Sequence, residues 1–341
     1  MRRRSGRFSS TTATARSSAS SAAPVALPED RGTAPGLSRR ATLLAWGAVA
    51  VTVLVWASFL VAVRAAVATP LGPVEVGLLR FVTGAVLFAP VWLRRGPLPG
   101  GVRLHHAAMI AGCGGFLFIL LLSTGMQFAP VADSGVFAPS MLPVYVALLS
   151  AIFLGDRFGP SRLFGLGLIL LGAVAIGGWE AIANAGNGAW RGHILISLGA
   201  FGWAIYTVAF RISGMRALDA AAMITFWSAL GFGVVALFVP LSFGAVPMET
   251  IALQVLFQGV LSGFVATFTY GYAIERLGAT RVAAFAALVP VLAALGGWVF
   301  LGEPIGLVKS IGIAVVATGV ALASGAVAFR RAAPGPAPST H

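Results

Sequence analysis

Two charged residues fall inside long apolar stretches, where an ionised side chain needs a specific reason to be present. Arg80 lies near the middle of the apolar stretch 70–93, and Asp133 opens the stretch 131–153. A guanidinium in a membrane costs several kcal/mol unless it faces a bundle interior, pairs, or reaches the interface. Arg80 therefore either binds an anionic ligand or serves structure, by capping carbonyls or by pairing with Asp133 or Glu75. Asp133 either faces a cavity mouth or caps free backbone N–H groups at a helix start.

A second group of candidates comprises polar, aromatic and proline residues within apolar stretches. A polar side chain there prefers another helix or a water-filled path to lipid. Each proline removes a backbone donor and frees a carbonyl one turn earlier, so it either lines a cavity or produces a simple kink. Packing and interfacial aromatic belts are the alternatives for the aromatic residues. Together with Arg80 and Asp133, the residues predicted to line a pathway for an amphipathic organic solute are Trp56, Ser140, Pro143, Tyr145, Trp203, Tyr206, Gln258, Tyr270 and Pro290.

The composition requires that these residues be positioned by membrane-spanning helices. Of the 341 residues, 58% are hydrophobic and 10% are charged, whereas a soluble domain carries about 25% charged residues. The mean hydropathy of +0.92 points the same way. A spanning helix needs about 20 apolar residues. Ten stretches meet this need: 42–63, 70–93, 104–125, 131–153, 161–178, 193–213, 218–240, 251–273, 279–301 and 306–329.

The basic residues predict the orientation. Placing the N-terminus in the cytoplasm leaves only Arg64, Arg191 and Lys309 on the opposite side, with Arg80 inside a span. The positive-inside rule therefore places both termini in the cytoplasm. Residues 1–40 are rich in Ser, Ala, Thr and Arg, which predicts a disordered basic cytoplasmic tail; an organellar transit peptide or a misassigned start codon are alternatives. Residues 330–341 form a short cytoplasmic tail.

The sequence matches itself at an offset of 147 residues. Trp56 falls on Trp203, Arg64 on Arg211, and Pro143 on Pro290, and the stretch 154–156 (Leu-Gly-Asp) falls on 301–303 (Leu-Gly-Glu). Each copy holds five spans, an odd number, so the second copy must cross the membrane in the opposite sense. The predicted fold is an all-α polytopic membrane protein of ten transmembrane helices in two inverted five-helix repeats, 41–178 and 191–329. Such repeats recur in secondary transporters, with the binding site beside interrupted helices at the midplane.

These residues resemble a known family. Trp56-Ala57-Ser58-Phe59, Arg80-Phe81 and the two stretches that run from Pro143 to Asp156 and from Pro290 to Glu303 are similar to the EamA family of the drug/metabolite transporter superfamily. The resemblance covers about 41–329. It implies ten helices and export or exchange of small metabolites across a bacterial inner membrane. Asp156 stands where the family usually has Glu. The first span lacks the acidic residue that smaller multidrug relatives use for proton coupling, so coupling by that route is not expected.

Other classes of site lack the residues they need. The sequence has no P-loop, no H-E-x-x-H and no G-x-S-x-G, and it has a single cysteine, Cys113, so we expect no catalytic residues, no metal and no cofactor. The four histidines lie mostly at span ends, where solvated positions suffice. The net charge of +13 is better explained by anionic lipid than by nucleic acid.

The favoured function is a non-enzymatic secondary transporter, an exporter or exchanger of a small organic metabolite or drug-like solute, working by alternating access. One alternative is a sugar-phosphate or nucleotide-sugar antiporter, in which Arg80 and Arg64 would serve an anion. A less favoured alternative is a membrane enzyme acting on lipid-linked substrates. The expected partners are the solute and the lipid bilayer. Glycines seven residues apart, in 165–172 and 312–319, predict a close contact between spans five and ten, and the same faces are compatible with a homodimer.

Overall fold

The computed structural model describes residues 39–183, 186, 188–277, 282 and 285–324. Within this part of the chain the regular secondary structure is helical, and no strand occurs. The helices are α1 (Arg39–Val67), α2 (Pro73–Leu87), α3 (Ala89–Arg95), α4 (Leu104–Ala111), α5 (Leu117–Gly125), α6 (Val131–Gly135), α7 (Leu142–Leu154), α8 (Pro160–Ala183), α9 (Ala189–Ser213), α10 (Ala217–Ala236), α11 (Met248–Gln254), α12 (Ala266–Leu277), α14 (Val289–Leu301) and α15 (Leu307–Ala323).

Three π-helical segments and one short 3₁₀ turn complete the described elements. The π segments are η1 (Gly112–Phe116), η2 (Val136–Ser140) and η4 (Val255–Val265), and the 3₁₀ turn is η3 (Phe243–Ala245). Each π segment lies within a spanning stretch: η1 joins α4 to α5, η2 lies between α6 and α7, and η4 joins α11 to α12. Gly112 of η1 and Gly259 of η4 are 147 residues apart, so these two interruptions fall at matched positions of the sequence repeat.

Seven helical stretches of the described chain are long and apolar enough to cross a membrane, and the bent pair α2–α3 brings the number to eight. α14 and α15 are shorter apolar helices. These findings confirm the multi-pass, all-helical membrane class. The tails predicted at 1–40 and 330–341 lie outside the described residues, except that Arg39 and Arg40 already begin α1.

The prediction of one uninterrupted helix over 70–93 is wrong. α2 and α3 meet at Phe88 with a bend of 64°. Pro90 is the second residue of α3. A proline has no N–H to donate to the carbonyl four residues earlier, here that of Val86, and its ring clashes with that carbonyl in a continuous helix. Elsewhere the predicted boundaries shift by several residues, most clearly where α8 continues to Ala183 and α9 begins at Ala189.

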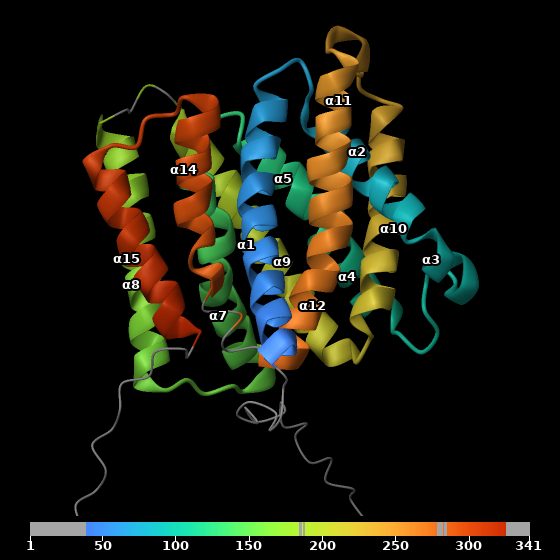
Figure 1. Ribbon diagram of the computed structural model, residues 1–341, viewed down its shortest axis with the longest axis horizontal. Helices are drawn as coiled ribbons and strands as arrows, with labels where there is room; N and C mark the ends of the chain where they lie inside the picture. Colours follow the sequence, from blue (N-terminus) through green and yellow to red (C-terminus); the bar gives the residue numbers. More distant parts are fainter. Residues whose placement is uncertain (1–38, 184–185, 187, 278–281, 283–284, 325–341) are drawn as a thin grey trace, which may run out of the picture.

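The helices pack as an upright bundle in which elements from the two halves alternate (Figure 1). α1 packs against α12 and α14, whereas α9 packs against α5 and α7. α2 packs against α10, and α8 against α15. α1 begins and α15 ends at the lower end of the bundle in Figure 1. We call this the lower end, and we call the opposite end, where α1 ends and α15 begins, the upper end.

The contact between α8 and α15 depends on four glycines. A Cβ on Gly165 would lie 2.7 Å from the Gly319 carbonyl oxygen, and one on Gly172 would lie 3.0 Å from that of Gly312. Residue numbers rise along one helix as they fall along the other, so the two helices run antiparallel with their backbones in close approach. The structure thus places these glycines in a contact within the chain, as the sequence analysis favoured.

Candidate functional site

Arg80 lies at the middle of α2 and reaches two other helical elements. Its Nη1 donates to the Ser262 hydroxyl at 2.9 Å and, at the longer distance of 3.4 Å, to the Gln258 carbonyl of η4. The guanidinium carbon lies 4.6 Å from the centre of the Phe59 ring of α1, within the range of a cation–π interaction. Arg80 as a whole residue is half-buried.

The predicted ion pair of Arg80 with Asp133 or Glu75 is wrong. The two carboxylate oxygens of Glu75 accept backbone N–H groups, from Gly72 at 3.1 Å and from Ser242 at 2.8 Å. Asp133 pairs with other bases, described below. No salt bridge of Arg80 occurs among the described residues; its hydrogen-bond partners there are neutral groups. The part of the structural interpretation that holds is the contact with a carbonyl.

Gln258 is fully buried next to this arginine. Its side-chain nitrogen donates to Gln254 Oε1 at 3.2 Å, and Gln254 in turn donates to the Ala62 carbonyl at 3.0 Å. The Oε1 atom of Gln258 has no hydrogen-bond partner among the described residues. A buried acceptor without a partner carries a desolvation penalty of about 1–3 kcal/mol, which a bound ligand or water would relieve.

The four predicted aromatic residues of α1, α9 and α12 form two matched groups. The Trp56 ring of α1 lies 5.1 Å from Tyr270 of α12. The Trp203 ring of α9 lies 4.3 Å from Phe118 of α5 and 5.8 Å from Tyr206. All four predicted residues are half-buried, and the Trp56–Tyr270 and Trp203–Phe118 contacts each join a residue of one half to a residue of the other.

Ser140, Pro143 and Tyr145 lie along the interrupted span of α6, η2 and α7. Pro139 cannot donate to the Gly135 carbonyl, and the Ser140 hydroxyl fills that place at 3.0 Å. Pro143 is the second residue of α7, where its missing N–H costs little. The Tyr145 hydroxyl lies 3.0 Å from the Ser197 hydroxyl of α9. These residues shape the helix and tie it to α9.

Pro290 occupies the same position in α14 that Pro143 occupies in α7, the second residue of the helix. It is buried. A Cβ on Gly135 would lie 3.0 Å from the Pro290 Cα atom, so the two backbones approach closely where α6 packs on α14. The structure therefore places Pro290 in a helix–helix contact.

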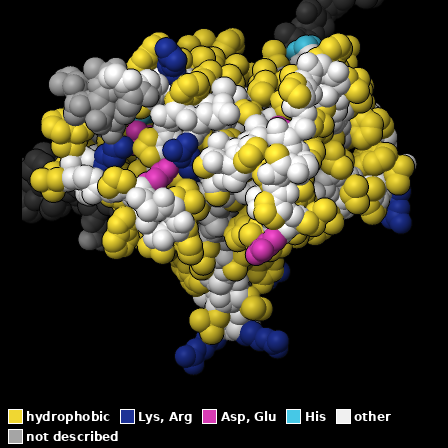
Figure 2. Space-filling view, turned by 90° about the horizontal axis from the view of Figure 1, so that it is seen from above, with side chains coloured by type: hydrophobic (Ala, Val, Ile, Leu, Met, Phe, Trp, Pro, Cys, Tyr) yellow, Lys and Arg dark blue, Asp and Glu magenta, His cyan; other side chains and the backbone are white. Residues whose placement is uncertain are grey.

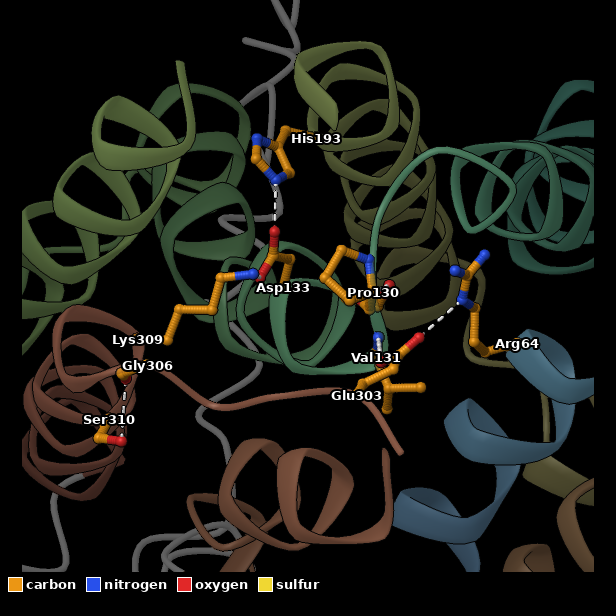
Figure 3. Close-up of polar contacts among 10 residues, drawn as sticks. Arg64, Pro130, Val131, Asp133, His193, Glu303, Gly306, Lys309 and Ser310 are labelled. Atoms are coloured by element: carbon orange, nitrogen blue, oxygen red, sulfur yellow. Dashed lines mark hydrogen bonds and ion pairs between the residues drawn. The ribbon is translucent and has the colours of Figure 1, made fainter. Parts of the chain in front are cut away.

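Asp133 is the centre of a buried cluster at the upper end (Figure 3). Its side chain is fully buried, with Oδ2 at 2.8 Å from His193 Nε2 and Oδ1 at 2.9 Å from Lys309 Nζ. His193 belongs to α9 and Lys309 to α15. The Phe137 ring stacks on the imidazole at 4.5 Å. Asp133 thus joins three helices through its side chain, and the predicted role as a helix cap is wrong.

A second ion pair lies on the other side of the α6 start (Figure 3). Glu303, in the α14–α15 connection, accepts from Arg64 Nε of α1 at 2.8 Å and from the Val131 N–H at 2.8 Å. Arg64 also donates to the Met126 carbonyl at 2.5 Å. Glu303 therefore caps the first turn of α6, a capping role on a helix remote in sequence. Seen from the upper end, basic and acidic side chains lie side by side within a rim of hydrophobic ones (Figure 2).

The lower end carries the matching pair. Arg211, at the end of α9, donates to Asp156 at 2.6 Å. At the repeat offset of 147 residues, Arg211 corresponds to Arg64, and Asp156 corresponds to Glu303. The lower side chains are 35% and 27% exposed, against 26% and 16% for Arg64 and Glu303. Each arginine therefore pairs with the acid of the other half.

His193 and Lys309 are the residues that the sequence analysis missed. The expectation of a solvated span-end position is wrong for His193, which is 7% exposed. One signal pointed to Lys309, since it is the single lysine of an arginine-rich chain. His193 carried no such signal, because its partner lies 60 residues away.

A lateral apolar pocket of about 580 Å³ lies between α1, α11–η4 and α14. Ser58 and Gln254 are its polar lining residues, and Gly296 forms part of its wall. None of the predicted site residues lines it.

Apolar spanning helices, interrupted segments and a few buried polar groups define this chain as a multi-pass helical membrane protein. The model of the EamA-like transporter family matches it twice, over residues 43–178 and 190–325. The chain belongs to the EamA-like transporter family, and its class is that of membrane transporters of small molecules, as the resemblance predicted.

Two similar proteins are named as a transporter and an exporter, and each matches this chain along most of its length. The chain is 27% identical to an uncharacterized transporter of Archaeoglobus fulgidus, over 81% of this chain and 96% of that protein. It is 29% identical to a protein of Streptantibioticus cattleyicolor named "Probable terminal-alkyne amino-acid exporter", over 79% of this chain and 91% of the relative. A solved crystal structure superposes with a TM-score of 0.55 at 22% identity, covering 83% of this chain and 96% of the solved one; this likeness concerns the fold.

Proposed function

We propose that the protein is a secondary transporter that exports or exchanges a small organic metabolite or drug-like solute by alternating access. Its ten helices form two inverted repeats, 41–178 and 191–329, in a bacterial inner membrane, with both termini in the cytoplasm. The observation that carries the proposal is the exchanged pair of salt bridges: Arg64 with Glu303 at one end and Arg211 with Asp156 at the other. A two-fold relation between the halves produces such a reciprocal pattern.

Two further observations support the inverted arrangement. α8 and α15, which correspond to each other in the repeat, run antiparallel through the Gly165–Gly319 and Gly172–Gly312 contacts. The family model also matches once within each proposed repeat. In inverted repeats, exchanging the conformations of the two copies changes which face is open, and the two ion pairs would then close opposite ends.

The substrate site proposed here centres on Arg80. Its guanidinium has a charge that the described residues leave without a counter-ion, and Gln258 Oε1 offers a buried acceptor nearby. A solute carrying a carboxylate would supply the missing anion, and the aromatic residues Trp56, Trp203 and Tyr206 would contact its apolar part. The named export of an amino acid by one relative agrees with this chemistry. Arg64 is engaged by Glu303, so the antiporter alternative loses one of its two arginines.

Reconstitution in liposomes tests the proposal. A panel of radiolabelled carboxylate-bearing metabolites, including amino acids, is assayed for counterflow with and without a pH gradient. We expect saturable flux of some members, its loss in Arg80→Ala with normal membrane insertion, and its retention in Arg94→Ala, an exposed arginine of α3. Turnover of a lipid substrate without solute flux would contradict the proposal and favour the enzyme alternative.

A further inference from the structure

The Asp133 cluster differs from an ordinary ion pair, because one fully buried carboxylate is shared by two bases. Lys309 Nζ lies 2.9 Å from one oxygen and His193 Nε2 lies 2.8 Å from the other. The side chains of Lys309 and His193 are 13% and 8% exposed. With an ionised Asp133, a charged Lys309 and a neutral His193, these three groups sum to zero charge.

The geometry defines which imidazole nitrogen is free. A carboxylate held by a lysine ammonium is an acceptor only, so His193 Nε2 must carry the hydrogen that it shares with Asp133. Nδ1 is then the basic nitrogen of the ring. It lies toward Gly177 of α8, where a Cβ would be 3.7 Å away. Histidine is the side chain whose charge changes between about pH 5 and 8.

The surrounding charges decide what an added proton would do. Among the described side chains, the charged groups at the upper end of the elements packed around α6 are Arg64 of α1, Arg191 of α9, Lys309 of α15 and Glu303 before α15. Glu303 is already bonded to Arg64 and to the Val131 N–H. A protonated His193 would therefore share Asp133 with Lys309, and the cluster would hold one uncompensated positive charge away from water, which is unfavourable.

We propose that the Asp133–His193–Lys309 cluster is a proton-binding site that locks the upper end of the bundle, and that a proton on His193 Nδ1 releases it. The proton adds to the Nδ1 lone pair, the charge of the cluster rises from zero to one, and Lys309 withdraws from Asp133 toward water. Lys309 is the more exposed of the two bases. Its withdrawal frees the start of α15 from α6.

The sequence repeat makes this site one-sided. At the offset of 147 residues, Asp133 corresponds to Thr280, His193 to Trp46, and Lys309 to Arg162. The other half thus retains a basic residue but has neither the carboxylate nor the imidazole. Only the acidity at the upper end would act on the lock. In the proposed transporter, on which this coupling to transport rests, a proton gradient would therefore bias the opening of one face.

Distance measurements between spin labels test the proposal without any solute flux. The full-length protein carries Cys113→Ala and label sites at Phe128→Cys, in the turn before α6, and Leu307→Cys, at the start of α15; these two positions are 38% and 76% exposed. In lipid nanodiscs we expect the ratio of long to short distances to rise about tenfold from pH 8 to pH 5, as for a proton that prefers the open form tenfold. His193→Gln, which can still donate to Asp133, should lose this response.

Two controls keep the result interpretable. His105→Gln changes an exposed histidine of α4 and should leave the response intact. Histidine-selective ¹⁵N NMR of the protein without any histidine substitution should show Nδ1 of the buried histidine gaining a proton over the same pH range. A distance distribution that ignores pH, or the same response in His193→Gln as in the parent, would overturn the proposal. Intact flux with no pH response would refute the proton lock and leave the transporter proposal standing. A pH response without flux would refute the transporter proposal and leave the proton lock standing.

Discussion

Neutralising the acid of each exchanged ion pair should open opposite ends of the protein by different amounts. Glu303→Gln weakens the bonds to Arg64 and to the Val131 N–H, and the two side chains of that pair are 26% and 16% exposed. Their loss should cost about 2 kcal/mol, between the values for exposed and buried pairs. Asp156→Asn weakens the more exposed pair with Arg211, for about 0.5–1 kcal/mol. We assume that each pair exists only while its end is closed. The population open at the upper end then rises about 30-fold in Glu303→Gln, and the population open at the lower end rises about 2- to 5-fold in Asp156→Asn.

Labelling of one cysteine from each side of the membrane measures these populations. Ser262→Cys, in a Cys113→Ala background, places the thiol beside Arg80, and a membrane-impermeant reagent is added to right-side-out or inverted vesicles. Glu303→Gln should raise the labelling rate from the upper face, and Asp156→Asn should raise it from the lower face. Glu249→Gln, an exposed acid of α11 at the upper end, is the matched control and should have no effect. Acceleration from the same face by both variants would refute the two-gate reasoning.

Three further predictions concern single contacts. Arg80→Lys should fail to restore flux although it keeps the charge, because a lysine lacks the planar donor fork; the measurement is counterflow at equal membrane abundance. Gly172→Ala should lower the free energy of unfolding by about 1–3 kcal/mol through overpacking between α8 and α15, whereas Gly167→Ala, which meets open space in the same helix, should be neutral or slightly stabilising in thermal denaturation. Ser140→Ala leaves a buried carbonyl without its donor and should cost about 1–3 kcal/mol, while Ser310→Ala at an exposed position should cost almost nothing in the same assay.

The sequence predicted the helical spans because each crossing requires a long apolar run, a property of local composition. It also placed Arg64 in register with Arg211, and Asp156 with Glu303, through the repeat. It did not predict that each arginine pairs with the acid of the other half, because that depends on how the halves pack. Pro90 could have predicted the break at Phe88. The stretch 70–93 is apolar on both sides of the break, however, so hydrophobicity alone predicts one continuous span.

The buried cluster could not be predicted from local pattern. Asp133 and His193 each stand near the start of a helical stretch, where capping and solvated positions are common, and their pairing spans 60 residues. For Arg80 the apolar surroundings identified an unusual residue, but not its partners, since Ser262 and the Gln258 carbonyl lie about 180 residues further on. Local sequence therefore identified candidate residues better than it identified their contacts.

On the proposed mechanism, the π segments determine where the bundle can bend when an end pair breaks. α8 and α15 approach so closely at their glycines that separating them would expose backbone, so this contact must persist in both states. Motion then falls to the spans with interruptions, η1, η2 and η4, where the regular i to i−4 hydrogen-bond ladder is already altered. The locks at Glu303 and Asp133 both act on the start of α6, directly above η2. Releasing these locks frees α6, which can then bend at η2. The upper end can therefore open while α8 and α15 stay packed against each other.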